Sequence, residues 1–215
     1  MPKEINTIIE KDESFKKLNS VLDEIKEHCK QKDKDWVCLV SGMEGAGKSI
    51  LALQLAQLLD PQFDAKKQTI RTWNKEHGYL DFIQKYRNDP FKSVVFDEDA
   101  VIRLLQNNER DTKASIKIFN ANSNTKHFPI LVVPSPWTLD KDMREQRVGS
   151  FFYVFRNKET NDRYFAYYSA KKMTHISQNE SLRKLFRHPD LFMKQVHPDF
   201  IEKFPKIENT FTFSS

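Results

Sequence analysis

One octapeptide places a lysine and a hydroxyl side chain directly behind three glycines. It fits the pattern G-x-x-x-x-G-K-[ST] of phosphate-binding P-loops. In such a loop the backbone N–H groups form a nest for phosphate oxygens, the lysine reaches the β- and γ-phosphates, and the hydroxyl ligates Mg²⁺. We therefore predict that Lys48 takes part in catalysis and that Ser49 holds the metal ion. The residues predicted to bind the nucleotide are Gly42, Met43, Glu44, Gly45, Ala46, Gly47, Lys48, Ser49 and Ile50.

The flanking sequence supplies the elements that such a loop requires. The apolar run at residues 36–40 predicts a buried strand ahead of it. Residues 50–59 are apolar and rich in strong helix formers, which predicts a helix behind it. The chain has only five glycines, and three of them lie in the octapeptide. This clustering indicates a backbone that a ligand approaches closely.

Two acids, Asp97 and Glu98, follow the apolar run at residues 93–96, where an ATPase carries its acidic pair. We expect Asp97 to hold Mg²⁺ through water and Glu98 to polarise the attacking water as general base. A solvated acidic loop at a strand end is the alternative. A third acid, Asp99, could cap the next helix.

Strands alternate with helices along the rest of the chain. Further strands are expected at residues 68–73 and 129–133, a β-hairpin at 151–155 and 164–168, and helices at 14–30, 78–87, 99–125, 139–147 and 181–187. This order predicts an α/β fold, a three-layer P-loop NTPase of the RecA-like class with a mainly parallel sheet. We expect an N-terminal segment (1–34), an ATPase core (35–178), and a C-terminal helical segment with a tail (179–215).

The composition and the first residues of the chain indicate which cellular compartment to expect. The chain has 215 residues, 39% hydrophobic and 30% charged, with a net charge of +5. No apolar run approaches the ~20 residues of a membrane span, and the first residues do not resemble a signal peptide. Cys29 and Cys38 are expected to be reduced thiols in a cytoplasmic protein.

Several segments together resemble the HerA–FtsK-type ATPases, in particular their compact zonular-occludens-toxin-like members from archaea, viruses and phages. These segments are the P-loop, Val-Val-Phe-Asp-Glu at 94–98, Ile-Leu-Val-Val-Pro at 130–134, and residues 139–148 with the aromatic strand behind them. The resemblance covers residues 35–168. It implies ATP and Mg²⁺ as cofactors and an oligomer, possibly a hexamer, that moves or packages double-stranded DNA in the cytoplasm or in a host cell. The polar sensor common in that family at the end of the fourth strand is reduced here to Ser135.

Arginines are the remaining catalytic candidates, since an arginine at the γ-phosphate can accelerate phosphoryl transfer ~10³-fold or more. Arg110 lies in a polar stretch, and Arg144 and Arg147 share one face of the short helix expected at 139–147. Because that helix follows a core strand, we expect it on the nucleotide-binding edge, with an arginine reaching a neighbouring subunit. Pairing with Asp140, Asp142 or Glu145 is the alternative.

Other functions stay open at this point. A GTPase is disfavoured, because Asn74-Lys75-Glu76-His77 lacks the guanine-reading aspartate and precedes the acidic strand. A nucleoside or nucleotide kinase would not need Glu98. A nucleotide-dependent assembly or DNA-binding subunit could use the basic residues of the C-terminal half, or these could be a solvated surface. The candidate DNA-binding residues are Lys171, Lys172, Arg183, Lys184 and Arg187, and alternatively Lys113, Lys117 and Lys126.

Overall fold

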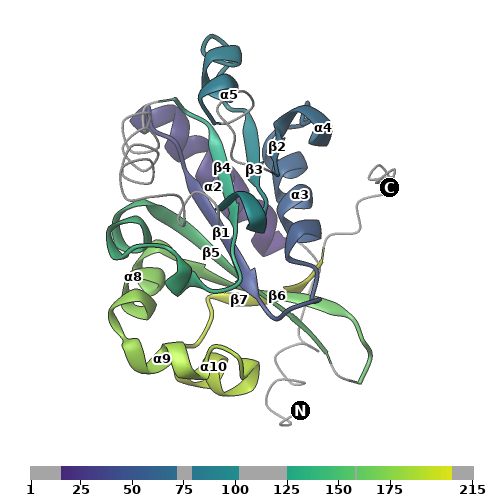
Figure 1. The fold of residues 1–215 in the computed structure, drawn as a ribbon, viewed down its shortest axis with the longest axis vertical. Helices are drawn as coiled ribbons and strands as arrows, with labels where there is room; N and C mark the ends of the chain where they lie inside the picture. Colours follow the sequence, from purple (N-terminus) through teal and green to yellow (C-terminus); the bar gives the residue numbers. More distant parts are fainter. Residues whose placement is uncertain (1–15, 72–78, 102–124, 158, 205–215) are drawn as a thin grey trace.

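The computed structural model describes residues 16–71, 79–101, 125–157 and 159–204. Its centre is a seven-stranded sheet in the order β2-β3-β4-β1-β5-β6-β7 (Figure 1). The parallel strands are β1 (Val37–Gly42), β2 (Thr69–Ile70), β3 (Ser93–Phe96), β4 (Phe128–Val132) and β5 (Val148–Arg156). Two antiparallel strands, β6 (Arg163–Ser169) and β7 (Phe200–Lys203), extend the sheet beyond β5. The predicted α/β class with a mainly parallel sheet is confirmed.

The position of β4 in the sheet determines how the P-loop and the acidic pair are arranged. It pairs with β1 on one side and with β3 on the other. The strand that leads into the P-loop is therefore separated from the acidic strand by one added central strand. Because all three strands are parallel, the P-loop and Asp97 lie at the same edge of the sheet.

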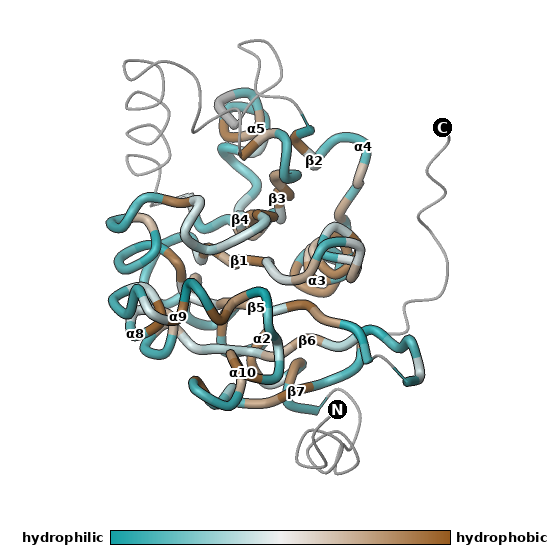
Figure 2. The backbone as a smooth tube through the Cα atoms, turned by 60° about the horizontal axis from the view of Figure 1, so that its bottom comes forward, coloured by the Kyte–Doolittle hydropathy of each residue, from teal (hydrophilic) through white to brown (hydrophobic). Residues whose placement is uncertain are grey.

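Helices cover both faces of the sheet and complete three layers. On one face lie α2 (Lys16–Lys32) and α3 (Lys48–Leu59), and the second of these is buried on most sides. On the other face lie α5 (Tyr79–Lys85), α8 (Ala170–Gln178), α9 (Glu180–Leu185) and α10 (Pro189–Gln195). The short α4 (Ala65–Gln68) precedes β2. Figure 2 shows apolar residues along the central strands and α3, and polar residues at the hairpin tip.

Side chains of the hairpin strands point alternately to the two faces of the sheet, and each face has its own core cluster. Phe151, Tyr153 and Phe155 pack with the α8–α10 layer, while Phe152 and Val154 pack with α2 and α3. The period of two is what a strand covered on both faces requires. In α2 the buried residues are Leu18, Leu22, Ile25 and Cys29, a single stripe on one side of the helix.

Several elements differ from the sequence-based expectation. The strand expected at 68–73 is only Thr69–Ile70 where it is described, because Gln68 belongs to α4. In place of the one regular helix expected at 139–147, this segment ends in a π-helical turn, η2 (Met143–Arg147). A 3₁₀ turn, η1 (Pro136–Thr138), lies just before the segment. The helices α8 and α10 and the strand β7 were not predicted. The helix expected at 99–125 begins at Glu98 and is described to Val101.

The three predicted domains stay a prediction. In the described part of segment 179–215, β7 pairs with β6 and so belongs to the central sheet. No helix in the described ranges is both long and apolar enough to cross a bilayer.

Candidate functional site

The P-loop is held at its root by the neighbouring strand. Gly42 ends β1, and a Cβ at this position would meet the carbonyl oxygen of Val154 in β5 at 2.1 Å. The next residue, Met43, donates its N–H to that same oxygen at 3.0 Å. Gly42 has a φ of 139°, a left-handed value that L side chains avoid. Glycine is therefore required where the loop leaves the sheet.

The P-loop leads into α3, whose N-terminus has no side-chain cap. The N-cap of α3 is Gly47, with a φ of 104° and no capping side chain. The free N–H groups of the first helical turn, with the positive end of the helix dipole, form an anion-binding site. All nine predicted nucleotide-binding residues, 42–50, lie in this loop and first turn.

Ser49 and Asp97 come together as a candidate metal site. The Oγ of Ser49 donates to Oδ1 of Asp97 at 3.2 Å. These oxygens fit Mg²⁺, which prefers oxygen ligands and usually completes its shell with water and substrate phosphates. No cluster of three or more His, Cys, Asp or Glu suited to a metal occurs in the described ranges. A resident ion at this edge would therefore depend on Ser49, Asp97 and the bound phosphates.

Lys48 and Glu98 meet beside that pair. Their Nζ and Oε2 atoms are 3.3 Å apart, and the side chains are 10% and 35% exposed. Asp97 accepts a hydrogen bond from the N–H of Glu98 at 2.9 Å. Asp97 immediately precedes the next helix, which begins at Glu98, and its carbonyl oxygen accepts from the N–H of Val101 at 3.1 Å. Asp99 lies exposed within the first turn instead of capping the helix. The predicted lysine, hydroxyl, aspartate and glutamate converge at one point.

Arg147 does not lie on the nucleotide-binding edge, where the sequence predicted it. It precedes Val148, which pairs with Val37 at the start of β1, the edge opposite the P-loop. Its Nη2 contacts both carboxylate oxygens of Asp35, at 2.9 and 3.2 Å. The Asp35 side chain is 1% exposed, and this burial raises its pKa to about 6 although Arg147 opposes the shift. The expected position on the nucleotide-binding edge is wrong for Arg147, which pairs with Asp35 at the opposite edge.

Arg144 is also engaged within the chain. Its Nη1 donates to the carbonyl oxygen of Leu139 at 2.6 Å, and its Nε donates to Oγ of Ser177 at 3.0 Å. The bond to Ser177 joins η2 to α8. Burial lowers the pKa of the Arg144 guanidinium. Arg110 lies outside the described residues, and a role in trans stays a prediction for it.

Sequence reasoning missed an arginine that reaches the loop. A Cβ at Gly47 would meet Cδ of Arg163 at 3.1 Å and its Nε at 3.3 Å. Arg163 begins β6, and its cross-strand partner Arg156 ends β5. The available signal was an arginine at each end of the predicted hairpin turn.

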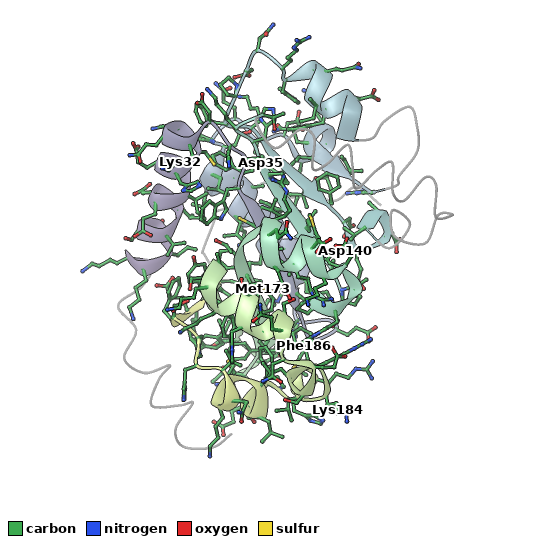
Figure 3. All side chains as sticks on the ribbon, turned by 90° about the vertical axis from the view of Figure 1, so that its left-hand side faces the viewer. Lys32, Asp35, Asp140, Met173, Lys184 and Phe186 are labelled. Atoms are coloured by element: carbon green, nitrogen blue, oxygen red, sulfur yellow. The ribbon has the colours of Figure 1, made fainter. Side chains whose placement is uncertain are left out.

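The basic residues of the C-terminal half lie on the other side of the molecule. Lys171, Arg183, Lys184 and Arg187 are exposed on or next to α8 and α9. Arg183 pairs with Glu180 at 3.0 Å, and Lys172 with Asp199 at 2.8 Å. Figure 3 looks onto this layer and labels Met173, Phe186 and, at its lower end, Lys184. Lys126 pairs with Asp33 at 2.8 Å, while Lys113 and Lys117 lie outside the described residues.

Comparisons with known proteins give distant structural likenesses. No family model and no curated protein matches the sequence. The N-terminal domain of zonular occludens toxin from Neisseria meningitidis is 14% identical, covers 63% of this chain and 84% of its own, and has a TM-score of 0.41. A KaiC-like protein from Pyrococcus horikoshii OT3 is 13% identical, covers 64% and 79%, and has a TM-score of 0.37. The AAA domain of FIGL-1 in complex with ADP is 14% identical, covers 95% and 87%, and has a TM-score of 0.41. The strand order and the loop geometry carry the fold assignment, a P-loop α/β fold with an added central strand.

Proposed function

We propose that this chain is a Mg²⁺-dependent P-loop ATPase that works as an oligomeric DNA translocation or packaging motor. The observation that supports hydrolysis is the convergence of Lys48, Ser49, Asp97 and Glu98 at one edge of the sheet. Glu98 favours an ATPase over a kinase, because a kinase activates a substrate hydroxyl and not a water molecule held at that glutamate.

Each of these residues has a separate part in the reaction. The loop N–H groups and Lys48 bind the phosphates. Ser49 and Asp97 would hold Mg²⁺, and the ion would supply positive charge to offset that of the phosphate oxygens. Glu98 accepts a proton from the attacking water as general base. Because Lys48 contacts Glu98 at 3.3 Å, phosphate binding transfers the lysine from the carboxylate to the nucleotide and frees Glu98 for the water.

The DNA part of the proposal depends on the exposed cations of α8 and α9. Lys171, Lys184 and Arg187 point into solvent, and the chain carries a net charge of +5. Contacts of this kind bind the phosphate backbone without reading sequence and weaken steeply with salt.

ATP turnover measured with and without double-stranded DNA, over a series of salt concentrations, tests the proposal. We expect DNA to stimulate hydrolysis. Replacing Arg183, Lys184 and Arg187 together by alanine should flatten the salt dependence of DNA binding. The matched control replaces Lys17, Lys30 and Lys32, which are exposed on α2, and should leave that slope unchanged. Stimulation by a nucleoside phosphate would indicate a kinase, and nucleotide binding without turnover would indicate an assembly subunit.

A further inference from the structure

The β5–β6 hairpin brings two arginines to the sheet face that carries the P-loop helix. Arg156 and Arg163 are direct cross-strand partners, so their side chains lie on the same face. That face also carries Val154 and Phe165, which pack with α2 and α3. Figure 1 shows the turn between β1 and α3 beside β6. Arg163 therefore approaches the loop from the side opposite to β4 and β3.

The contact with the loop is close. Cδ and Nε of Arg163 lie 3.1 and 3.3 Å from a Cβ built at Gly47, so a side chain at this position would have to displace Arg163. The ring of Phe204 lies 3.2 Å from the same point. Its backbone N–H donates to the carbonyl oxygen of Arg163 at 3.1 Å. The end of β7 thus fixes the start of β6 against the last loop glycine.

The positive charges of Arg156 and Arg163 are not balanced by acidic residues of the hairpin. Among the residues that the structure describes, the Arg163 guanidinium has no hydrogen bond or ion pair. Arg156 donates to Oδ1 of Asn161 at 2.9 Å, and its Nε is buried without a partner. The acid next to Arg163, Asp162, pairs with Lys203 at 2.8 Å. Like charges directly opposite on neighbouring strands destabilise a sheet, so an anion at the loop would relieve this repulsion.

The two sides of the loop fix the direction of a bound nucleotide. Lys48, Ser49, Asp97 and Glu98 mark the side toward β4 and β3, where the γ-phosphate and metal belong. Arg163 marks the other side, toward β5 and β6. A triphosphate bound in the loop with its terminal phosphate at Glu98 would direct its nucleoside end toward the hairpin.

We propose that Arg163 is a nucleotide-binding residue that contacts the α- and β-phosphates from within the same subunit. The inference rests on the proposed nucleotide site and adds a second cation to Lys48. Because the α- and β-phosphates are present in ATP and ADP alike, Arg163 strengthens the binding of both nucleotides. It therefore contributes to KM and leaves the chemical step to Lys48 and Glu98.

Calorimetric titration of ADP and of a non-hydrolysable ATP analogue tests this role. We expect Arg163→Ala to weaken both by ~10- to 100-fold, the effect of losing a charge-assisted hydrogen bond. Arg163→Lys keeps the charge without the guanidinium fork, so its loss should be smaller. KM should rise with kcat nearly unchanged. Lys194→Ala is the control, because it removes an exposed cation on α10, on the other face of the sheet, and should change neither affinity.

Thermal unfolding separates a binding role from a structural one. Without nucleotide, Arg163→Ala should unfold at the parental temperature or above it, since repulsion with Arg156 is removed. Addition of ADP should stabilise it much less than the parental protein. Unchanged ADP affinity overturns the proposal. So does a fall in kcat with ADP affinity retained, which would place Arg163 at the γ-phosphate. A parental protein that binds no nucleotide would instead refute the proposed function, and the inference with it.

Discussion

At the residue scale, Lys48 and Glu98 touch each other but serve different steps. Lys48→Ala removes the cation of the phosphate nest and should weaken ATP binding. Glu98→Gln should slow hydrolysis on the order of 10²-fold or more, as the loss of a general base does. It should not weaken ATP binding, because it frees Lys48 from a carboxylate 3.3 Å away. Equilibrium binding and single-turnover hydrolysis measure the two effects.

The control for Glu98 is its exposed neighbour. Asp99→Asn removes an acid from the same helical turn and should leave hydrolysis at the parental rate. If Glu98→Gln also hydrolysed ATP at the parental rate, the general base would have to be sought elsewhere.

A second residue-scale prediction concerns pH. Burial lowers the pKa of His127 from 6.5 to about 4, and its Nδ1 accepts a hydrogen bond from the N–H of Lys92 at 3.3 Å. Between these pKa values the unfolded chain binds a proton that the folded chain does not. The contribution of His127 to the free energy of unfolding should therefore fall on acidification, by on the order of 2 kcal/mol from pH 7 to pH 5.

Asp35 acts in the opposite direction. Its pKa is about 6 in the folded chain, above the ordinary 3.8, so the folded chain takes up a proton on acidification that the unfolded chain does not. This raises the free energy of unfolding, and the two contributions partly cancel in the whole protein. Urea unfolding of parental and His127→Asn protein at both pH values isolates the histidine, because asparagine can still offer an acceptor. Equal losses on acidification in both proteins would show that His127 does not control this slope.

At the element scale, the junction of β1 and the P-loop should be the most sensitive backbone position of the site. Gly42→Ala puts a Cβ 2.1 Å from the carbonyl oxygen of Val154, which forces β1 and β5 apart. We expect a loss of about 3 kcal/mol or more in the free energy of unfolding. Gly45→Ala is the control, since its φ is 69° but nothing lies within 4 Å of the added atom. It should lose about 1 kcal/mol. Equal losses in urea unfolding would mean that loop conformation, and not the β1–β5 contact, limits stability.

The elements that carry local signals were predictable. The P-loop, its flanking strand and helix, and the acidic strand follow from residue types within a few positions of each other. The four residues of β7 become a strand only by pairing with β6, a contact that no local pattern encodes. Arg163 was missed for the same reason, because its contact with Gly47 joins segments far apart in the sequence.

The sequence-based prediction put Arg147 at the wrong edge of the sheet for a topological reason. The chain leaves β4 at the P-loop edge, and β5 is parallel to β1. The connection must therefore return to the opposite edge before β5 can begin, and the residue just before Val148 lies there. The helical turns η1 and η2 form this crossover.

At the scale of the whole molecule, the two proposed activities occupy different layers. The nucleotide site lies at the sheet edge where α3 begins, whereas the exposed cations of α8 and α9 lie on the opposite face. The strands β5 and β6 touch both, because Arg163 reaches the loop and Tyr153 donates through its hydroxyl to the carbonyl oxygen of Phe186 at 2.7 Å. A motor could transmit nucleotide-dependent movement through this hairpin.

Assembly is the last property to test. Arg144 and Arg147 are engaged inside the chain, so Arg110 is the expected arginine in trans. Specific activity should rise with protein concentration. Mixing Arg110→Ala with Glu98→Gln protein should partly restore hydrolysis, because the first keeps Glu98 and the second supplies Arg110 at a mixed interface.

Arg147→Ala is the contrasting variant in that experiment. It leaves the buried Asp35 carboxylate unpaired and should lose about 3 kcal/mol of stability. Its remaining folded fraction should hydrolyse ATP at the parental rate and should gain nothing from mixing with Glu98→Gln protein. Concentration-independent hydrolysis by a stable monomer, without rescue in any mixture, would remove the motor. A P-loop ATPase that works as a single subunit would then account for the site.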